Sequence, residues 1–186
     1  MLKEALENNR FIANSTMLAS AAMVVAGVIQ ITDEQSSEST AVGIEHVSLA
    51  AFSVMLIALV PLVLHLGRRA GRESLAKAAS VAMVALSAIS VTSNINGEDL
   101  AIFPAIAVPA NLVILVTLVL IGVGLRRRAG VALPIAIALP LTWILLLPLS
   151  AVGGGFLAAA VYAVIAYKVS NGTLEGEAGA AIPATA

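Results

Sequence analysis

The chain of 186 residues contains no cysteine, and only 11% of its residues are charged. Without cysteine there is no disulfide, no thiolate ligand for zinc or an iron–sulfur cluster, and no thiol nucleophile. Soluble domains carry about a quarter of their residues as charged side chains, so this chain has too few to cover a water-exposed surface. The formal net charge of −1 gives no bias toward nucleic acid, and no nucleic-acid partner is expected.

What the chain has instead is apolar sequence, with 60% of its residues hydrophobic. A transmembrane helix needs about 20 mostly apolar residues, and six runs of this kind follow one another. They cover residues 11–31, 47–66, 75–93, 102–125, 131–150 and 152–167. The predicted fold class is therefore all-α and integral to the membrane. A six-transmembrane-helix bundle occupies residues 11–169, between an N-terminal segment 1–10 and a flexible tail 170–186.

Two of these assignments have alternatives. The segment 131–168 is too long for one span, and Pro148 together with three glycines at 153–155 divides it into two helices; a re-entrant segment is the alternative. The first run follows Lys3 and Arg10, as in a secretory signal peptide. Its apolar stretch of about 20 residues exceeds the roughly 7–15 of a signal peptide, so we interpret it as a retained helix.

Charge placement supports the six-helix arrangement, because it sorts the charges between the two sides of the membrane. The side that receives both chain ends holds Lys3, Arg10, Arg68, Arg69, Arg72, Lys77, Arg126, Arg127, Arg128 and Lys168, which are all ten basic residues. The other side holds Asp33, Glu34, Glu38, Glu45, Glu98 and Asp99 and neither Lys nor Arg. Cytoplasmic loops are rich in Lys and Arg. We therefore expect both ends in the cytoplasm and a multi-pass protein of the plasma (cytoplasmic) membrane.

A short motif, Arg-Arg-Ala-Gly, occurs at 68–71 and again at 127–130. Each copy follows an outward-to-inward helix and precedes an inward-to-outward one. One interpretation is a parallel repeat, in which helices two and three are duplicated as helices four and five, as in many transporters. The other is that a basic pair and a helix-terminating glycine suit any short cytoplasmic hairpin.

Packing in lipid depends on close approach of helix backbones, which small residues allow. The sixth predicted helix places Gly155, Ala159 and Ala163 at four-residue spacing, so it is expected in the interior with the Ala- and Ser-rich third helix. Pro140 lies within the fifth predicted helix and frees the carbonyl of Ala136 from its usual partner. Such a carbonyl either bonds to a neighbouring helix or lines a cavity.

The predicted spans contain no Asp, Glu, Lys or Arg, and this absence bears on which classes of membrane protein the chain can belong to. Proton pumps, ion-coupled carriers and voltage sensors usually keep such groups at membrane depth, so these classes are disfavoured. His46 and His65 lie about 28 Å apart along a helix and cannot share a metal ion or one haem. No cofactor or metal is expected. The least favoured alternative is a haem protein or another membrane enzyme that uses His46 or His65.

Two groups of residues are candidate binding sites. Amides near the outer leaflet need hydrogen-bond partners, which they find either across helices or in a pocket for a polar or amphipathic ligand. These ligand-pocket candidates, with the nearby histidine, are Gln30, His46, Asn94, Asn96 and Asn111. On the cytoplasmic side, arginines are candidates for contact with anionic lipid headgroups. They are Arg68, Arg69, Arg72, Arg126, Arg127 and Arg128.

These features together predict a non-enzymatic protein whose first partner is the lipid bilayer. It would serve as a subunit or partner of a larger membrane complex, form a homo-oligomer, or bind a lipid-like ligand. The alternative is a small carrier or channel for a neutral or lipophilic solute. That function would use the outer amides and the kinks expected at Pro109 and Pro140.

Overall fold

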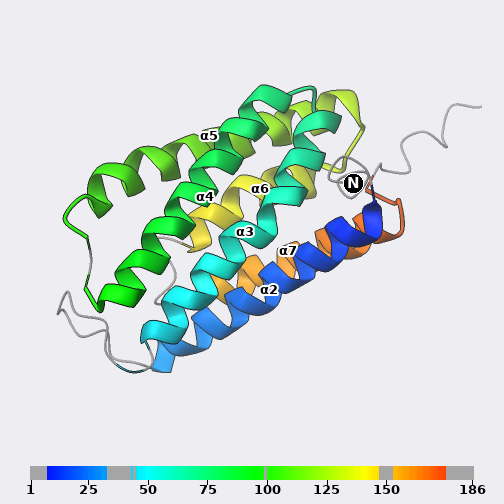
Figure 1. The fold of residues 1–186 in the computed structure, drawn as a ribbon. Coiled ribbons are helices and arrows are strands. Elements are labelled where there is room, and N and C mark those ends of the chain that lie inside the picture. The colour runs from blue at the N-terminus through cyan, green and yellow to red at the C-terminus, as the bar shows by residue number, and fades with distance from the viewer. Residues whose placement is uncertain (1–7, 33–42, 44, 99, 147–152, 175–186) are drawn as a thin grey trace, which may run out of the picture.

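The computed structural model describes residues 8–32, 43, 45–98, 100–146 and 153–174, and these residues form six α-helices (Figure 1). The helices are α2 (Asn9–Thr32), α3 (Glu45–Arg69), α4 (Glu73–Asn96), α5 (Phe103–Arg128), α6 (Leu133–Leu146) and α7 (Gly154–Ser170). The first four have 24 to 26 residues and are long and apolar enough to cross a membrane. The predicted all-helical bundle of membrane-protein type is confirmed.

The last two helices are apolar but shorter, with 14 residues in α6 and 17 in α7. At about 1.5 Å per residue they extend about 21 and 26 Å, less than the roughly 30 Å of a hydrocarbon core. The predicted break at Pro148 lies in 147–152, outside the described residues. The N-terminal residues 1–7 and the tail residues 175–186 also lie outside them, whereas Leu174 is buried against the core.

Two helices run past the ends that hydropathy predicts for them. We expect apolar segments to end near 66 and 125, yet α3 continues to Arg69 and α5 to Arg128. Backbone hydrogen bonding does not stop where side chains become charged, so each helix ends nearer to a glycine. Gly71 and Gly130 have φ of 65° and 62°, the left-handed backbone of a helix-terminating glycine. Both interpretations of the Arg-Arg-Ala-Gly motif predict this backbone, so the parallel repeat stays a prediction.

The described helices form a ring in which each packs on the next in sequence and successive helices run in opposite directions (Figure 1). The ring is closed by α7, which packs on α2, and α3 also contacts α5. Figure 1 shows the turn between α3 and α4 and the turn between α5 and α6 at the same end of the molecule. This arrangement brings the two Arg-Arg-Ala-Gly segments, 68–71 and 127–130, to one end of the bundle, although they are 59 positions apart in sequence.

Small residues hold α2 against α7. A Cβ on Gly155 would lie 3.4 Å from both the Cα of Gly27 and the carbonyl oxygen of Met23, so the two backbones are in near contact. Ser20 donates a hydrogen bond of 2.8 Å to the carbonyl of Ala159 across the same interface. Serine plays the same part between α3 and α4, where Ser87 of α4 donates to the backbone carbonyl of Ser53 of α3. Interfaces of this kind are typical of helices that pack in lipid.

The largest fully buried side chains are Trp143 of α6 and Tyr162 of α7. Thr142 donates to the carbonyl of Leu139, and its Oγ1 lies 3.0 Å from the Tyr162 hydroxyl, which is therefore the donor of that pair. Among the described residues, every buried polar side-chain atom has a hydrogen-bond partner. In the described part of the chain, the apolar centre of the bundle therefore contains no unsatisfied polar side chain.

Candidate functional site

At one end of the bundle, His46 at the start of α3 is joined to Asn94 near the end of α4. The Asn94 side-chain amide donates to the backbone carbonyl of His46 at 3.1 Å, and its Oδ1 is in hydrogen-bond contact with His46 Nδ1. Because Oδ1 can only accept, His46 Nδ1 is the donor in this contact. The two contacts clamp the start of α3 to the end of α4.

Asn111 of α5 makes a second polar contact, separate from the first. Its Nδ2 donates to the carbonyl of Ala107, one turn earlier, and its Oδ1 accepts a 3.1 Å hydrogen bond from Trp143 Nε1 of α6. Within the described part of the chain, no hydrogen bond links this pair to His46 and Asn94. Trp143 was not among the residues singled out from sequence, although a lone tryptophan at membrane depth requires an acceptor for its indole N–H.

The other ligand-pocket candidates, Gln30 and Asn96, take no part in these two pairs. Gln30 is half-buried on α2, and Asn96 is exposed in the last turn of α4. Of the six acids expected on this side, Glu98 is exposed, whereas Asp33, Glu34, Glu38, Asp99 and the Glu45 side chain lie outside the described residues. The described residues hold no cluster of three His, Asp or Glu side chains that would bind a metal ion.

His65 lies at the other end of α3, half-buried and one turn before Arg69. A six-coordinate haem at His65 would need a second ligand such as a methionine. Met83 is fully buried in the bundle, whereas Met17 is 50% exposed on its outer surface. The histidines themselves sit at opposite ends of one helix, as their spacing predicts. The haem hypothesis stays a prediction.

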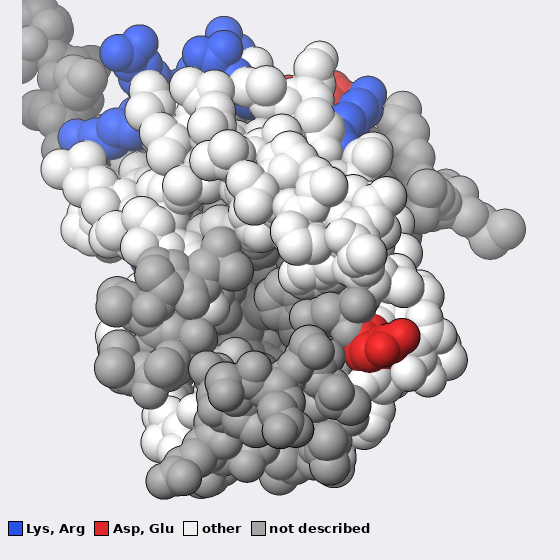
Figure 2. All heavy atoms as spheres, turned by 90° about the vertical axis from the view of Figure 1, so that its left-hand side faces the viewer, with Lys and Arg blue, Asp and Glu red and all other residues white. Residues whose placement is uncertain are grey.

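The arginine candidates gather at the end of the bundle opposite to Asn94. The Arg128 guanidinium packs on Gly71, where an added Cβ would overlap it. Gly124 packs on Ala70, whose carbonyl oxygen would lie 2.7 Å from an added Cβ. The turn after α3 and the end of α5 are therefore in direct contact. Their arginines form one group, which we call the arginine collar: Arg68, Arg69, Arg72, Arg126, Arg127 and Arg128. Figure 2 shows the Lys and Arg side chains gathered along the top of the view, with acidic atoms both beside them and well below them.

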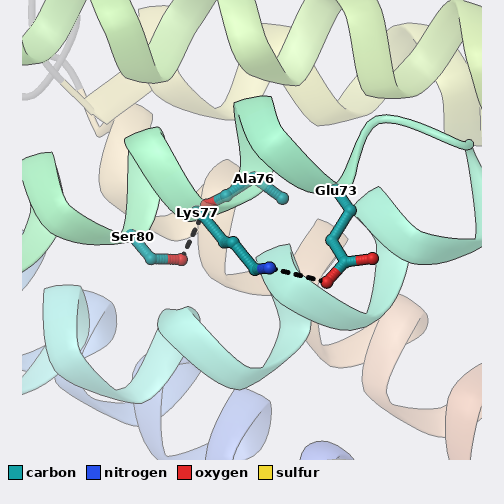
Figure 3. A network of polar contacts seen from close by, with 4 residues as sticks. All are labelled: Glu73, Ala76, Lys77 and Ser80. Carbon is teal, nitrogen blue, oxygen red and sulfur yellow. Dashed lines mark hydrogen bonds and ion pairs between the residues drawn. The ribbon is translucent and has the colours of Figure 1, made fainter.

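Next to the collar, the first turns of α4 carry an ion pair of their own (Figure 3). Lys77 Nζ lies 2.9 Å from Glu73 Oε1, one turn back on the same helix, and Ser80 donates to the carbonyl of Ala76. Both charged side chains are more than half exposed, so the pair adds little stability. It does balance the Lys77 charge locally, and the positive field at this end therefore comes chiefly from the arginines.

A groove runs along the surface between α5 and α6, beginning at the collar. Its volume is about 460 Å³, and apart from two arginines its lining is formed by apolar side chains and glycine. Arg126 and Arg127 line one end and Ile144 the other. At its floor α5 and α6 meet backbone to backbone, because a Cβ on Gly122 would lie 2.4 Å from the carbonyl oxygen of Ala136.

The groove was not predicted from sequence, although its two signals are present there. One is Pro140, which frees the Ala136 carbonyl, and the other is the glycine pair at 122 and 124 on the preceding helix. Neither signal identifies a groove without the crossing of α5 over α6.

The chain was compared with protein-family models, curated proteins and solved structures, and it shows no significant match to any of them.

Proposed function

We propose that the chain crosses the plasma (cytoplasmic) membrane six times, with both ends in the cytoplasm. Four helices are long enough by themselves. The shorter α6 and α7 are apolar, pack in the same ring and run antiparallel to their neighbours, which supports spans for them as well. The arginine collar at one end then marks the cytoplasmic side by the positive-inside rule.

Within that topology, we propose that the protein is non-catalytic and functions by binding anionic lipids through the arginine collar. The observation that carries this proposal is the packing of Arg128 on Gly71, which joins two basic turns into one cluster. Each basic residue near an anionic membrane surface contributes about 1 kcal/mol of attraction. Six arginines held in one place therefore favour phosphate-bearing headgroups over zwitterionic ones.

Two other functions remain proposals. A role as subunit or partner of a larger membrane complex is compatible with the broad apolar outer surface, on which residues such as Val81 and Ile95 are 69% and 80% exposed. A carrier or channel for a neutral solute is less favoured, because Asn94 and Asn111 each engage a neighbouring helix. A carrier of that kind would lose solute flux in liposomes on Asn111→Leu.

Lipid retention tests the proposed function. The protein is reconstituted with equal amounts of phosphatidylglycerol and phosphatidylcholine, extracted in mild detergent and examined by native mass spectrometry. We expect phosphatidylglycerol to be enriched, and the enrichment to fall in an Arg72→Gln/Arg128→Gln variant. The matched control is Arg10→Gln/Lys168→Gln, which removes the same charge outside the collar. Uptake at the bulk lipid ratio would contradict the proposal, and an equal fall in both variants would reduce it to general surface charge.

A further inference from the structure

The groove between α5 and α6 has the dimensions and the chemistry of a site for one acyl chain. From Leu133 to Ile144 its α6 wall extends about 17 Å at 1.5 Å per residue. One leaflet of a bilayer is about half of the ~30 Å hydrocarbon core. The groove therefore reaches from the collar roughly to the midplane of the membrane, and it lies beside a single leaflet.

Charge is confined to one end of this groove. Arg126 and Arg127 lie at the collar end, and both are exposed. The one hydrogen bond that Arg126 makes in the described structure is long, 3.4 Å to the Val131 carbonyl, and a guanidinium has five N–H donors. Paired N–H groups of arginine match phosphate oxygens in geometry. The end that faces the headgroup layer thus suits an anionic phosphate, and the rest suits hydrocarbon.

We propose that the groove is a specific binding site for one anionic phospholipid of the cytoplasmic leaflet. One acyl chain lies between α5 and α6 over Gly122, and the phosphate is held by Arg126 and Arg127. This proposal rests on the proposed function and sharpens it, because it separates one retained lipid from the general attraction of the collar. The proposed occupant is a phospholipid, because the oxygens of one phosphate can accept from both guanidinium groups. A free fatty acid, whose carboxylate an arginine also matches, is one outcome of the test.

The experiment fills the groove without changing charge. Val119 lines the groove and is 43% exposed, so a tryptophan there occupies the space of the acyl chain. The matched control is Val81→Trp on the outer face of α4, where the side chain is 69% exposed and lies outside the groove. A second variant, Arg126→Gln/Arg127→Gln, removes the phosphate contact and leaves the apolar lining unchanged.

Each protein is reconstituted in vesicles of equal phosphatidylglycerol and phosphatidylcholine, extracted and examined by native mass spectrometry. The wild type and Val81→Trp retain one tightly held phosphatidylglycerol. Val119→Trp and Arg126→Gln/Arg127→Gln retain about tenfold less, the change for a loss of about 1.4 kcal/mol. Equal retention in Val119→Trp and Val81→Trp, a retained phosphatidylcholine, or an adduct with the mass of a fatty acid would overturn the proposal. If Val119→Trp retains lipid but Arg72→Gln/Arg128→Gln does not, the groove site is wrong and the collar stands.

Discussion

The carbonyl oxygen of Ala136 lies against the backbone of Gly122, close enough that a Cβ on Gly122 would come within 2.4 Å of it. Pro140 has no N–H to bond this oxygen within α6, and the neighbouring α5 backbone supplies the contact instead. Weak Cα–H···O contacts of this kind recur at helix–helix interfaces. This contact sets how closely α5 and α6 approach and therefore how the groove beside them is shaped.

Replacing Gly122 with alanine tests that contact. Alanine is normally better than glycine in a helix by about 1 kcal/mol, but here its methyl group would overlap a backbone oxygen. We expect a net loss of about 1–3 kcal/mol, as in other overpacked cores, measured as a lower unfolding temperature in detergent. Gly27→Ala is the matched control, because the nearest atoms to its Cβ would be those of the Phe156 ring, at 3.5 Å and beyond, which is ordinary van der Waals contact. Equal stability of the two variants would show that the Gly122 contact imposes no constraint.

Asn94 is expected to stabilise the bundle through its clamp on His46. Polar contacts between membrane helices average about 0.6 kcal/mol and reach about 1.7, and Asn94→Leu removes two of them. We expect a loss in that range by thermal unfolding in detergent. Asn96→Leu changes an exposed amide two residues away and should have no comparable effect. A fully stable Asn94→Leu protein would show that the clamp is not formed.

Trp143 is the only tryptophan of the chain, so its fluorescence reports on its contact with Asn111 directly. Buried in the bundle, it should resist quenching by acrylamide in the folded protein. Asn111→Leu leaves the indole N–H without its acceptor, which costs about 1–3 kcal/mol, and shifts the emission to shorter wavelength. Emission that does not change in this variant would argue against the pair.

The sequence predicts most of the helices of this molecule. A membrane span must be apolar along about 20 residues, so it can be recognised without knowing which helices are its neighbours. The position of each polar residue along its helix also follows. What the sequence does not give is rotation about the helix axis. Asn94 and Asn111 were placed at similar depth in one group, yet the structure turns them toward different partners, His46 and Trp143.

The arginines illustrate the same limit. Their position at one end of the bundle follows from counting helices, whereas the contact of Arg128 with Gly71 depends on which helices are neighbours in the ring. The groove depends further on the angle at which α5 crosses α6, which Gly122 and Pro140 set together. Features that arise from one helix are thus predictable here, and features that arise between two helices are not.

Because the chain has no cysteine, single introduced cysteines can test the proposed topology, a bundle in the membrane with its basic end in the cytoplasm. Single cysteines are introduced at Ser74 and Ser170, both exposed at the basic end, and at Asn96, exposed at the other end. Cells are then treated with a membrane-impermeant maleimide. We predict that Asn96→Cys is labelled in intact cells and that Ser74→Cys and Ser170→Cys are labelled only after permeabilisation. Labelling of Ser74→Cys from outside intact cells would contradict the account.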